Sequence, residues 1–583
     1  MSSTQQPLII KDWDQGIGAS PHKGFGLFRN ADIESFPGAV KVNKKPGSYF
    51  HSIPTQTFTA NATSNECTAP TAVETNGINF NGAAVYFTTT GTLPAGLSTN
   101  TIYYLYKISS AVFKVCTSYQ NSAGSSAGTV IDITDAGSGV HTINQVAIGT
   151  INWVIKDPRT GIHWMLGSNG RVWFAISNIA YLLHNSALET AATGITNASG
   201  NGICLNPFSS TSLTYLFVFR NAKIDVINVF GLTAIEALGW SNNWQSLNSG
   251  TASTNTHHAL KGQDDAVYFC DDRYVGSIIE NAGSTFDPSS SGTYTYNNQA
   301  LDLPVYEVAQ CLEELGSDLL IGGNTLNQIY PWDRISDSFN IPLSVPEFSV
   351  KKMKNIGGTV YILAGSTGNI YLTQGTYTKW FVRLPVYLTN NAGSIQSNYV
   401  TWGGIAAVGA SLLVGAGTVT SGNSGVWRIF PNGRMIIDNV PSAGSTNVTA
   451  IYAETEFYIM GYSGGADNFN SAQYGTLLYD SFQTVIQSAL FRVATKLGKA
   501  TYSRLEVVLD RPATGGNIRV SYRFDLSSNF STIDTFSADG TTYIFTSETV
   551  GLIDIDDIQV QVEMNDSNFG AVDIGLAEIR LFP

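Results

Sequence analysis

The chain has 583 residues, of which only 13% are charged, and it carries a formal net charge of −13. A chain of this length exceeds one core, so about three or four domains are expected. The scarcity of charged residues excludes an architecture of long amphipathic helices, and the acidic balance argues against specific nucleic-acid recognition.

Residues 1–52 form a turn-rich segment that includes the glycine-rich stretch Gly16–Gly26. Residues 1–11 lack a charged stretch followed by an apolar one, so we expect no signal peptide. No run of 18 apolar residues predicts a membrane span anywhere in the chain. A short strand is predicted at Gly38–Val42. We expect this strand, and with it the segment 1–52, to contribute to a β-propeller formed by later residues. One blade would borrow the strand to close the ring, which hides both strand edges.

Residues 53–145 predict a separate small β-module inserted after that first strand. Turn-rich stretches such as Thr92–Leu97 connect its short alternating runs. Five strands are expected, around Phe58, Val85–Phe87, Ile102–Tyr106, Phe113–Val115 and Val130–Ile133.

Residues 146–485 repeat a pair of strands about every 50 residues, which is typical of a β-propeller. The clearest copies run from Asp318–Asn324 to Gln328–Trp332 and from Thr359–Gly365 to Asn369–Leu372. Seven copies begin near His163, Tyr215, Ala266, Asp318, Thr359, Leu412 and Phe457. About seven blades are therefore predicted. The first two copies and the last are weaker, so six or eight blades stay open.

Residues 486–583 change to strictly alternating strands, which predict a small antiparallel sandwich of jelly-roll type. The expected strands are Arg504–Leu509, Ile518–Arg523, Tyr543–Phe545, Ile558–Glu563 and Ala577–Leu581. The fold class predicted for the whole chain is thus all-β.

Motifs that carry chemistry are weak in this sequence. There is no nucleophile elbow and no Walker loop. The only histidine pair, His257–His258, is interpreted as loop surface, since neighbours on a strand face opposite ways. Trp153, Trp164, Trp173 and Trp332 sit in alternating runs and are expected to pack between blades. The five cysteines, expected to be single buried residues rather than a disulfide set or a zinc site, are Cys67, Cys116, Cys204, Cys270 and Cys311.

Paired carboxylates would suit glycoside hydrolysis. The candidates are Asp264–Asp265, Asp271–Asp272, Glu313–Glu314, and Asp554 with Asp556–Asp557. Acidic pairs at strand ends more often form turns, so we predict no catalytic residues and no enzymatic activity. Gly464–Asn468 is a weak calcium lead without the usual loop pattern, so no metal or cofactor is predicted.

Three segments resemble modules of tailed-bacteriophage structural proteins. The stretch Phe25–Glu34 with Phe36–Val40 is similar to the start of virion proteins that carry propellers. The inserted module, with Thr92–Ser98 and Gly128–Ile133, resembles a β-module found in several virion proteins. The sandwich, opening at Phe491–Leu497, looks like a third such module.

The resemblance implies a structural protein of the virion tail, made in the host cytoplasm and placed in a nozzle, tail-tip ring or adaptor. Its partners would be other copies of itself around a symmetry axis and other tail proteins. The alternatives are a host-receptor-binding protein that recognises surface glycan or protein, and a tail-associated glycan-degrading enzyme.

Overall fold

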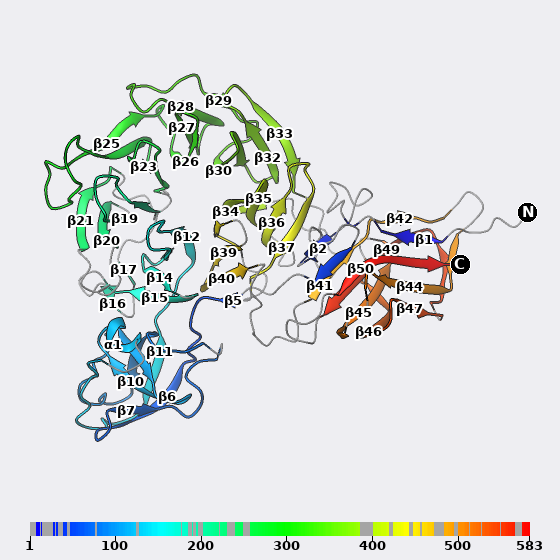
Figure 1. The fold of residues 1–583 in the computed structure, drawn as a ribbon, viewed down its shortest axis with the longest axis horizontal. Coiled ribbons are helices and arrows are strands. Elements are labelled where there is room, and N and C mark those ends of the chain that lie inside the picture. Colours follow the sequence, from blue (N-terminus) through cyan, green and yellow to red (C-terminus); the bar gives the residue numbers. More distant parts are fainter. Residues whose placement is uncertain are drawn as a thin grey trace, which may run out of the picture.

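The computed structural model spans residues 1–583 and is shown in Figure 1. The structure describes residues 7–583 except 12, 14–26, 30, 33–38, 43–46, 76–77, 124–127, 177, 185–188, 191–193, 196–201, 221, 230–239, 249–256, 385–399, 419–423, 442–446, 455–456, 471–482, 495–498, 512–513, 526–527, 549 and 566–573. The stretch Gly16–Gly26 therefore lies outside the described residues.

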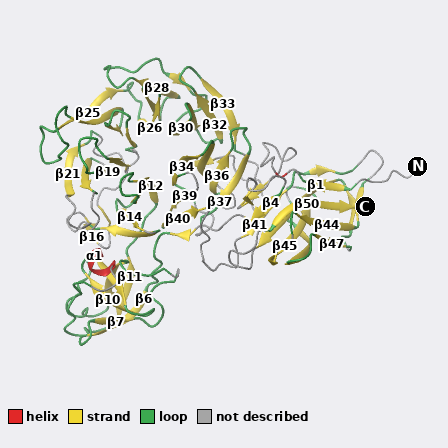
Figure 2. Cartoon of the chain, in the orientation of Figure 1, coloured by secondary structure: helices red, strands yellow, loops and turns green. Residues whose placement is uncertain are grey.

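The described residues are all-β apart from one short helix, α1 (Tyr119–Ala123) (Figure 2). No helix in this part of the chain has the length and apolar character needed to cross a membrane. The all-β class predicted from the sequence is confirmed.

Four-stranded antiparallel units follow one another around a ring (Figure 1). We number them sheets 1 to 7 in chain order. Sheet 1 consists of β12 (Ile151–Lys156), β13 (His163–Gly167), β14 (Val172–Ile176) and β15 (Ile179–Leu183). Sheet 2 consists of β18 (Gly202–Asn206), β19 (Tyr215–Arg220), β20 (Lys223–Asn228) and β21 (Trp240–Ser246). Sheet 3 consists of β22 (Ala259–Lys261), β23 (Val267–Asp271), β24 (Tyr274–Glu280) and β25 (Tyr294–Asp302). The two-residue strands β16 (Glu189–Thr190) and β17 (Gly194–Ile195) pair between sheets 1 and 2.

The remaining sheets complete the ring. Sheets 4 to 7 are β26 (Ala309–Leu315), β27 (Asp318–Gly323), β28 (Gln328–Trp332) and β29 (Leu343–Ser344); β30 (Val350–Ile356), β31 (Thr359–Ala364), β32 (Asn369–Thr373) and β33 (Thr378–Arg383); β34 (Val400–Val408), β35 (Ser411–Thr418), β36 (Gly425–Ile429) and β37 (Met435–Asn439); and β38 (Ala450–Ala453), β39 (Phe457–Tyr462), β40 (Gly465–Asn470) and β5 (Gly47–Ser48). All seven repeat anchors predicted from the sequence fall within one residue of the start of a second strand.

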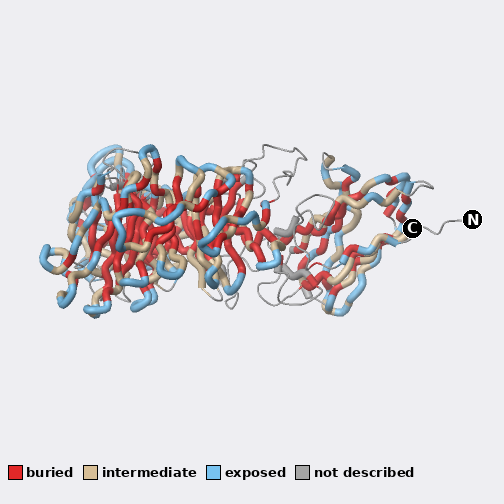
Figure 3. Tube along the Cα trace, turned by 90° about the horizontal axis from the view of Figure 1, so that it is seen from above, coloured by how far each residue is buried: buried red, intermediate tan, exposed pale blue. Residues whose placement is uncertain are grey.

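Apolar side chains pack between successive sheets and hold the ring together. Sheets 1 and 2 share a cluster with Trp164, sheets 3 and 4 one with Trp332, and sheets 7 and 1 one with Trp173. The packing role predicted for these tryptophans is confirmed. Buried residues lie mainly in the interior, and exposed residues lie mainly at the outer bends of the chain (Figure 3). The first strands of successive sheets contact one another, so they form the inner wall of the ring.

Ring closure uses a different strand from the one predicted. β5 pairs with β40, Ser48 lying opposite Asp467, whereas β4 (Val40–Val42) pairs with the C-terminal strand β50 (Gly575–Phe582). The prediction that Gly38–Val42 closes the ring is wrong. A two-residue strand such as β5 has no alternation to detect, and Val40–Val42 pairs instead between β3 and β50.

Residues 56–145 form a closed six-stranded barrel with its own core. Its strands are β6 (Gln56–Asn61), β7 (Glu66–Thr68), β8 (Ala84–Thr89), β9 (Tyr103–Lys107), β10 (Val112–Cys116) and β11 (His141–Gln145). The strand predicted at Val130–Ile133 is wrong: Val130 makes one isolated bridge to Cys116, and the sixth strand lies at His141–Gln145.

The C-terminal sandwich takes strands from both ends of the chain. One sheet contains β3 (Ala31–Asp32), β4, β50, β44 (Arg504–Leu509) and β47 (Ile544–Ser547), with β1 (Leu8–Ile10) also on β50. The other runs through β2 (Leu27–Arg29), β41 (Gln483–Gln487), β49 (Asp557–Asn565), β45 (Thr514–Arg523) and β46 (Ser531–Asp539); β42 (Phe491–Arg492) pairs with β49, and β43 (Ala500–Tyr502) with β48 (Leu552–Ile555).

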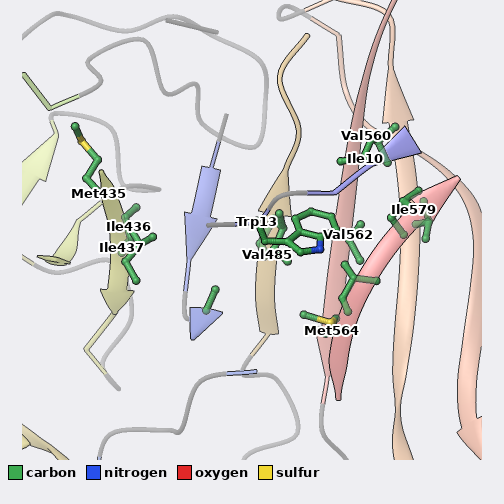
Figure 4. Packing of buried hydrophobic residues seen from close by; sticks show 14 of the residues in the cluster. Ile10, Trp13, Met435, Ile436, Ile437, Val485, Val560, Val562, Met564 and Ile579 are labelled. Atoms are coloured by element: carbon green, nitrogen blue, oxygen red, sulfur yellow. The ribbon is translucent and has the colours of Figure 1, made fainter. Parts of the chain in front are cut away.

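The ring and the sandwich are continuous. β2 lies parallel to β37 of sheet 6 and antiparallel to β41, so one ten-stranded sheet crosses between them. They also share a core, in which Trp13 is packed beside Val485 and Val562 (Figure 4). Of residues 1–52, predicted to contribute to the propeller, β5 completes sheet 7 and β2 lies beside β37 of sheet 6, whereas β1, β3 and β4 belong to the sandwich.

Candidate functional site

The predicted carboxylate pairs are used in turns and ion pairs. Asp265 and Asp272 lie between strands with φ of 62° and 60°, and Asp554 lies within β48 with φ of 58°. A left-handed backbone at Asp is typical of tight turns, where the short side chain can bond the local backbone. Asp271 ends β23 with its side chain fully buried, and Asp557 lies in β49 opposite Arg492.

Arg334 brings two of the predicted pairs together. Its guanidinium lies 2.5 Å from Glu314 and 3.7 Å from Asp264, and it stacks over Tyr268 at 5.6 Å. Asp264 also accepts a hydrogen bond from Tyr268 at 2.6 Å. Asp264 and Glu314 are thus both paired with the Arg334 guanidinium, and this network connects sheet 3 to sheet 4.

The other predicted pairs are also engaged. Glu313 lies 3.5 Å from Lys354, although burial raises the pKa of this carboxyl. Asp556 lies 3.4 Å from Lys499. Among the described residues, no group of three or more potential metal ligands is found. In the calcium lead, Gly464 lies in the turn between β39 and β40, and residues 465–468 belong to β40.

The cysteines are all buried and free, as predicted. Burial raises the pKa of Cys67, Cys204 and Cys311 to about 12. Thiols of this kind are unreactive at neutral pH.

The histidine pair is not loop surface, and that prediction is wrong. His257 is buried and its Nδ1 lies 2.9 Å from the carbonyl of Cys270. His258 lies on the inner wall of the ring, where its Nδ1 accepts the Leu312 N–H at 2.9 Å. Their position, just before a first strand of the ring, was not recognisable because β22 is only three residues long.

A cluster at the ring axis joins three sheets through Trp153, His258 and Lys352. The indole of Trp153 (β12) lies 5.0 Å from the ring of His258, which precedes β22. Lys352 (β30) places its ammonium 4.7 Å from the same indole. Burial and, less strongly, Lys352 and Lys354 hold the pKa of His258 well below its usual value, so the ring is neutral.

A second feature is an apolar surface, the loop patch, formed by Val305, Tyr306, Leu326 and Phe348. Tyr306 is 84% exposed and Phe348 is 69% exposed. The patch comes from the connections between sheets 3 and 4, between β27 and β28, and between sheets 4 and 5. These loops are held together, since Asn324 accepts from Ser349 Oγ at 2.5 Å and donates its N–H to the Val308 carbonyl at 2.9 Å.

Comparison with known proteins gives no family. No family model matches the chain, and no curated protein matches it. Solved structures similar to it include the β-propeller domain of Myceliophteria thermophila Cps50 (Swd1), with 10% identity and a TM-score of 0.37 over 57% of this chain and 99% of that one.

Two further structures are similar over the same share of the chain. The WD40 β-propeller domain of Doa1 has 11% identity and a TM-score of 0.36 over 56% of this chain and 94% of that one. A catalytically inactive virginiamycin B lyase from Staphylococcus aureus has 14% identity and a TM-score of 0.37 over 55% and 94%. These likenesses concern the β-propeller fold and carry no argument about function.

Proposed function

We propose that the protein is a structural component of a tailed-phage virion, placed in the tail as a nozzle, tail-tip ring or adaptor, and that it acts through protein–protein assembly. The continuity of ring and sandwich carries the proposal, because a shared ten-stranded sheet and a shared core resist bending between the two parts. A stiff block of this kind suits repetition around a symmetry axis. The proposed class, a phage virion protein, comes from the resemblance of three segments to phage virion modules.

The same proposal includes the finer architecture. The seven sheets act as seven blades of a β-propeller, and the C-terminal part is a sandwich of jelly-roll type. The barrel of residues 56–145 projects from the ring beside sheet 1 (Figure 1), where it can contact a neighbouring copy or another tail protein.

The test is the oligomeric state of the full-length chain by light scattering, with negative-stain imaging of the particles that contain it. We expect rings of defined copy number, or labelled protein at the tail end. A monomer that never enters particles would contradict the proposal.

The loop patch favours a second candidate, a receptor-binding protein for host-surface glycan or protein. Exposed aromatic rings on fixed loops are typical of binding surfaces. Full-length Tyr306→Ser and Phe348→Ser should then bind host cells at least tenfold more weakly. Tyr377→Ser is the matched control, since Tyr377 is 68% exposed in the β32–β33 turn. Equal loss in all three variants, or in none, rejects a receptor role for the patch.

A further inference from the structure

The lysines of the inner wall differ in how their charge is balanced. The described first strands of the seven sheets contain Lys156, Lys261, Lys351, Lys352 and Lys354. Lys156 is paired with Glu454, Lys261 lies 2.7 Å from Asp265, and Lys354 lies 3.5 Å from Glu313. Lys351 and Lys352 have no carboxylate within 4.0 Å among the described residues.

Lys352 is the more constrained of the two. Burial lowers its pKa, and no carboxylate is among the groups that act on it, only the thiols of Cys311 and Cys270. A partly desolvated ammonium without a counter-charge destabilises a fold. Cation–π attraction to the Trp153 indole offsets only part of that cost.

His258 adds a second donor beside the same indole. Its Nδ1 is occupied by the Leu312 N–H at 2.9 Å, so a neutral ring carries its hydrogen on Nε2. The position therefore combines an ammonium and an imidazole N–H, both of them donors. His258, Lys352 and Trp153 are each only half-buried, so solvent reaches the cluster.

We propose that the ring axis holds an oxyanion-binding site, in which the Lys352 ammonium and the His258 Nε2–H bind a small phosphate-type anion beside the Trp153 indole. The anion would supply the missing counter-charge and connect sheets 1, 3 and 5 across the axis. This inference does not depend on the proposed place of the protein in a virion.

The probe is inorganic phosphate, compared with chloride at equal ionic strength in thermal unfolding and titration calorimetry of the full-length protein. The wild type should show a saturable rise in Tm with phosphate. Lys352→Met keeps most of the side-chain volume without the charge, and should weaken phosphate binding at least tenfold. Lys352→Arg should retain it.

Lys379→Met is the matched control, because Lys379 is an exposed lysine on the outer strand β33 and should leave phosphate binding unchanged. In phosphate-free buffer, Lys352→Met should be at least as stable as the wild type, since it removes an unbalanced charge. The proposal is overturned if the wild type gives no saturable response, if the response survives in Lys352→Met, or if Lys352→Met is clearly less stable without phosphate.

Discussion

Two glutamates, Glu307 and Glu347, accept hydrogen bonds from equivalent loops of the ring. Glu307 accepts hydrogen bonds from the N–H groups of Thr325 and Leu326 and from the Tyr330 hydroxyl, at 2.8, 3.1 and 3.1 Å. Glu347 accepts from Asn369 Nδ2 at 2.6 Å and from the Tyr371 hydroxyl at 3.0 Å. Each carboxylate therefore fixes the turn between the second and third strands of its sheet.

Glycine at position 365 makes room for the second of these carboxylates. It has φ of +60°, and a Cβ there would overlap Glu347 Oε2. Gly365→Ala should displace the carboxylate and cost about 2–4 kcal/mol, the sum of backbone strain and lost, partly buried hydrogen bonds. Urea unfolding of the full-length protein measures this loss in the free energy of unfolding.

The control is Gly358→Ala, at φ of +84° with open space around the missing Cβ. It should cost only the backbone strain, about 1–2 kcal/mol. Equal costs for the two variants would show that the Glu347 bonds add nothing to stability.

Individual side chains were only partly predictable from the sequence. The buried cysteines and packing tryptophans follow from residue type and alternation, which are local properties. The axial cluster does not, because Trp153, His258 and Lys352 are far apart in sequence and meet only when the ring closes. No local pattern marks such a meeting point.

At the scale of the elements, the seam between sheet 7 and sheet 1 closes the ring. Phe50, just after β5, is 3% exposed and packs edge-on against Trp173 at 5.1 Å. Across the same seam, Thr449 Oγ1 donates to the Ile151 carbonyl at 2.6 Å. The strand order around the ring was therefore recognisable from the repeats, while the closing strand was not, since its pairing depends on residues more than 400 positions away.

Phe50→Ala should open this seam. Removal of a buried phenyl group costs about 3–5 kcal/mol through lost burial and the cavity left behind. Chemical denaturation of the full-length protein measures the loss. Phe348→Ala, which removes an exposed ring, should change stability by less than about 0.5 kcal/mol; similar losses would mean that Phe50 does not support the closure.

The seam should also weaken in acid. His163 lies against Tyr452 and Phe457, at ring distances of 5.3 and 5.7 Å. Burial and, secondarily, Lys156 lower the pKa of His163 to about 4, against the opposite effect of Glu454. A folded-state pKa below the unfolded one gives stability that is present above about pH 6.5 and is lost as the pH falls towards 4.

His163→Gln removes this titration while keeping a polar side chain of similar size. Between pH 7 and pH 4.5 the wild type should lose about 1–2 kcal/mol more unfolding free energy than the variant does. Parallel pH profiles would exclude His163 as the acid-sensitive group.

The whole molecule contains a ring and sandwich that share a core, and a barrel whose main core is separate. Calorimetry should therefore show two transitions. Phe113→Ala, in the barrel core, should lower mainly one of them, and Trp427→Ala, in the shared core, mainly the other. A single transition that both variants shift equally would mean that the barrel is fully coupled to the ring.

The sandwich has a consequence for the order of synthesis. Among the described residues, β1 pairs with β50 and β4 pairs with β50 and β3, and Trp13 donates its indole N–H to the Ala577 carbonyl at 2.6 Å. Strands β1 and β4 must therefore wait until residues 575–582 have been synthesised before they can pair with β50. A chain interrupted before β50 would leave β1 and β4 without their main partner, so the C-terminal sheet could be completed only in copies translated through β50.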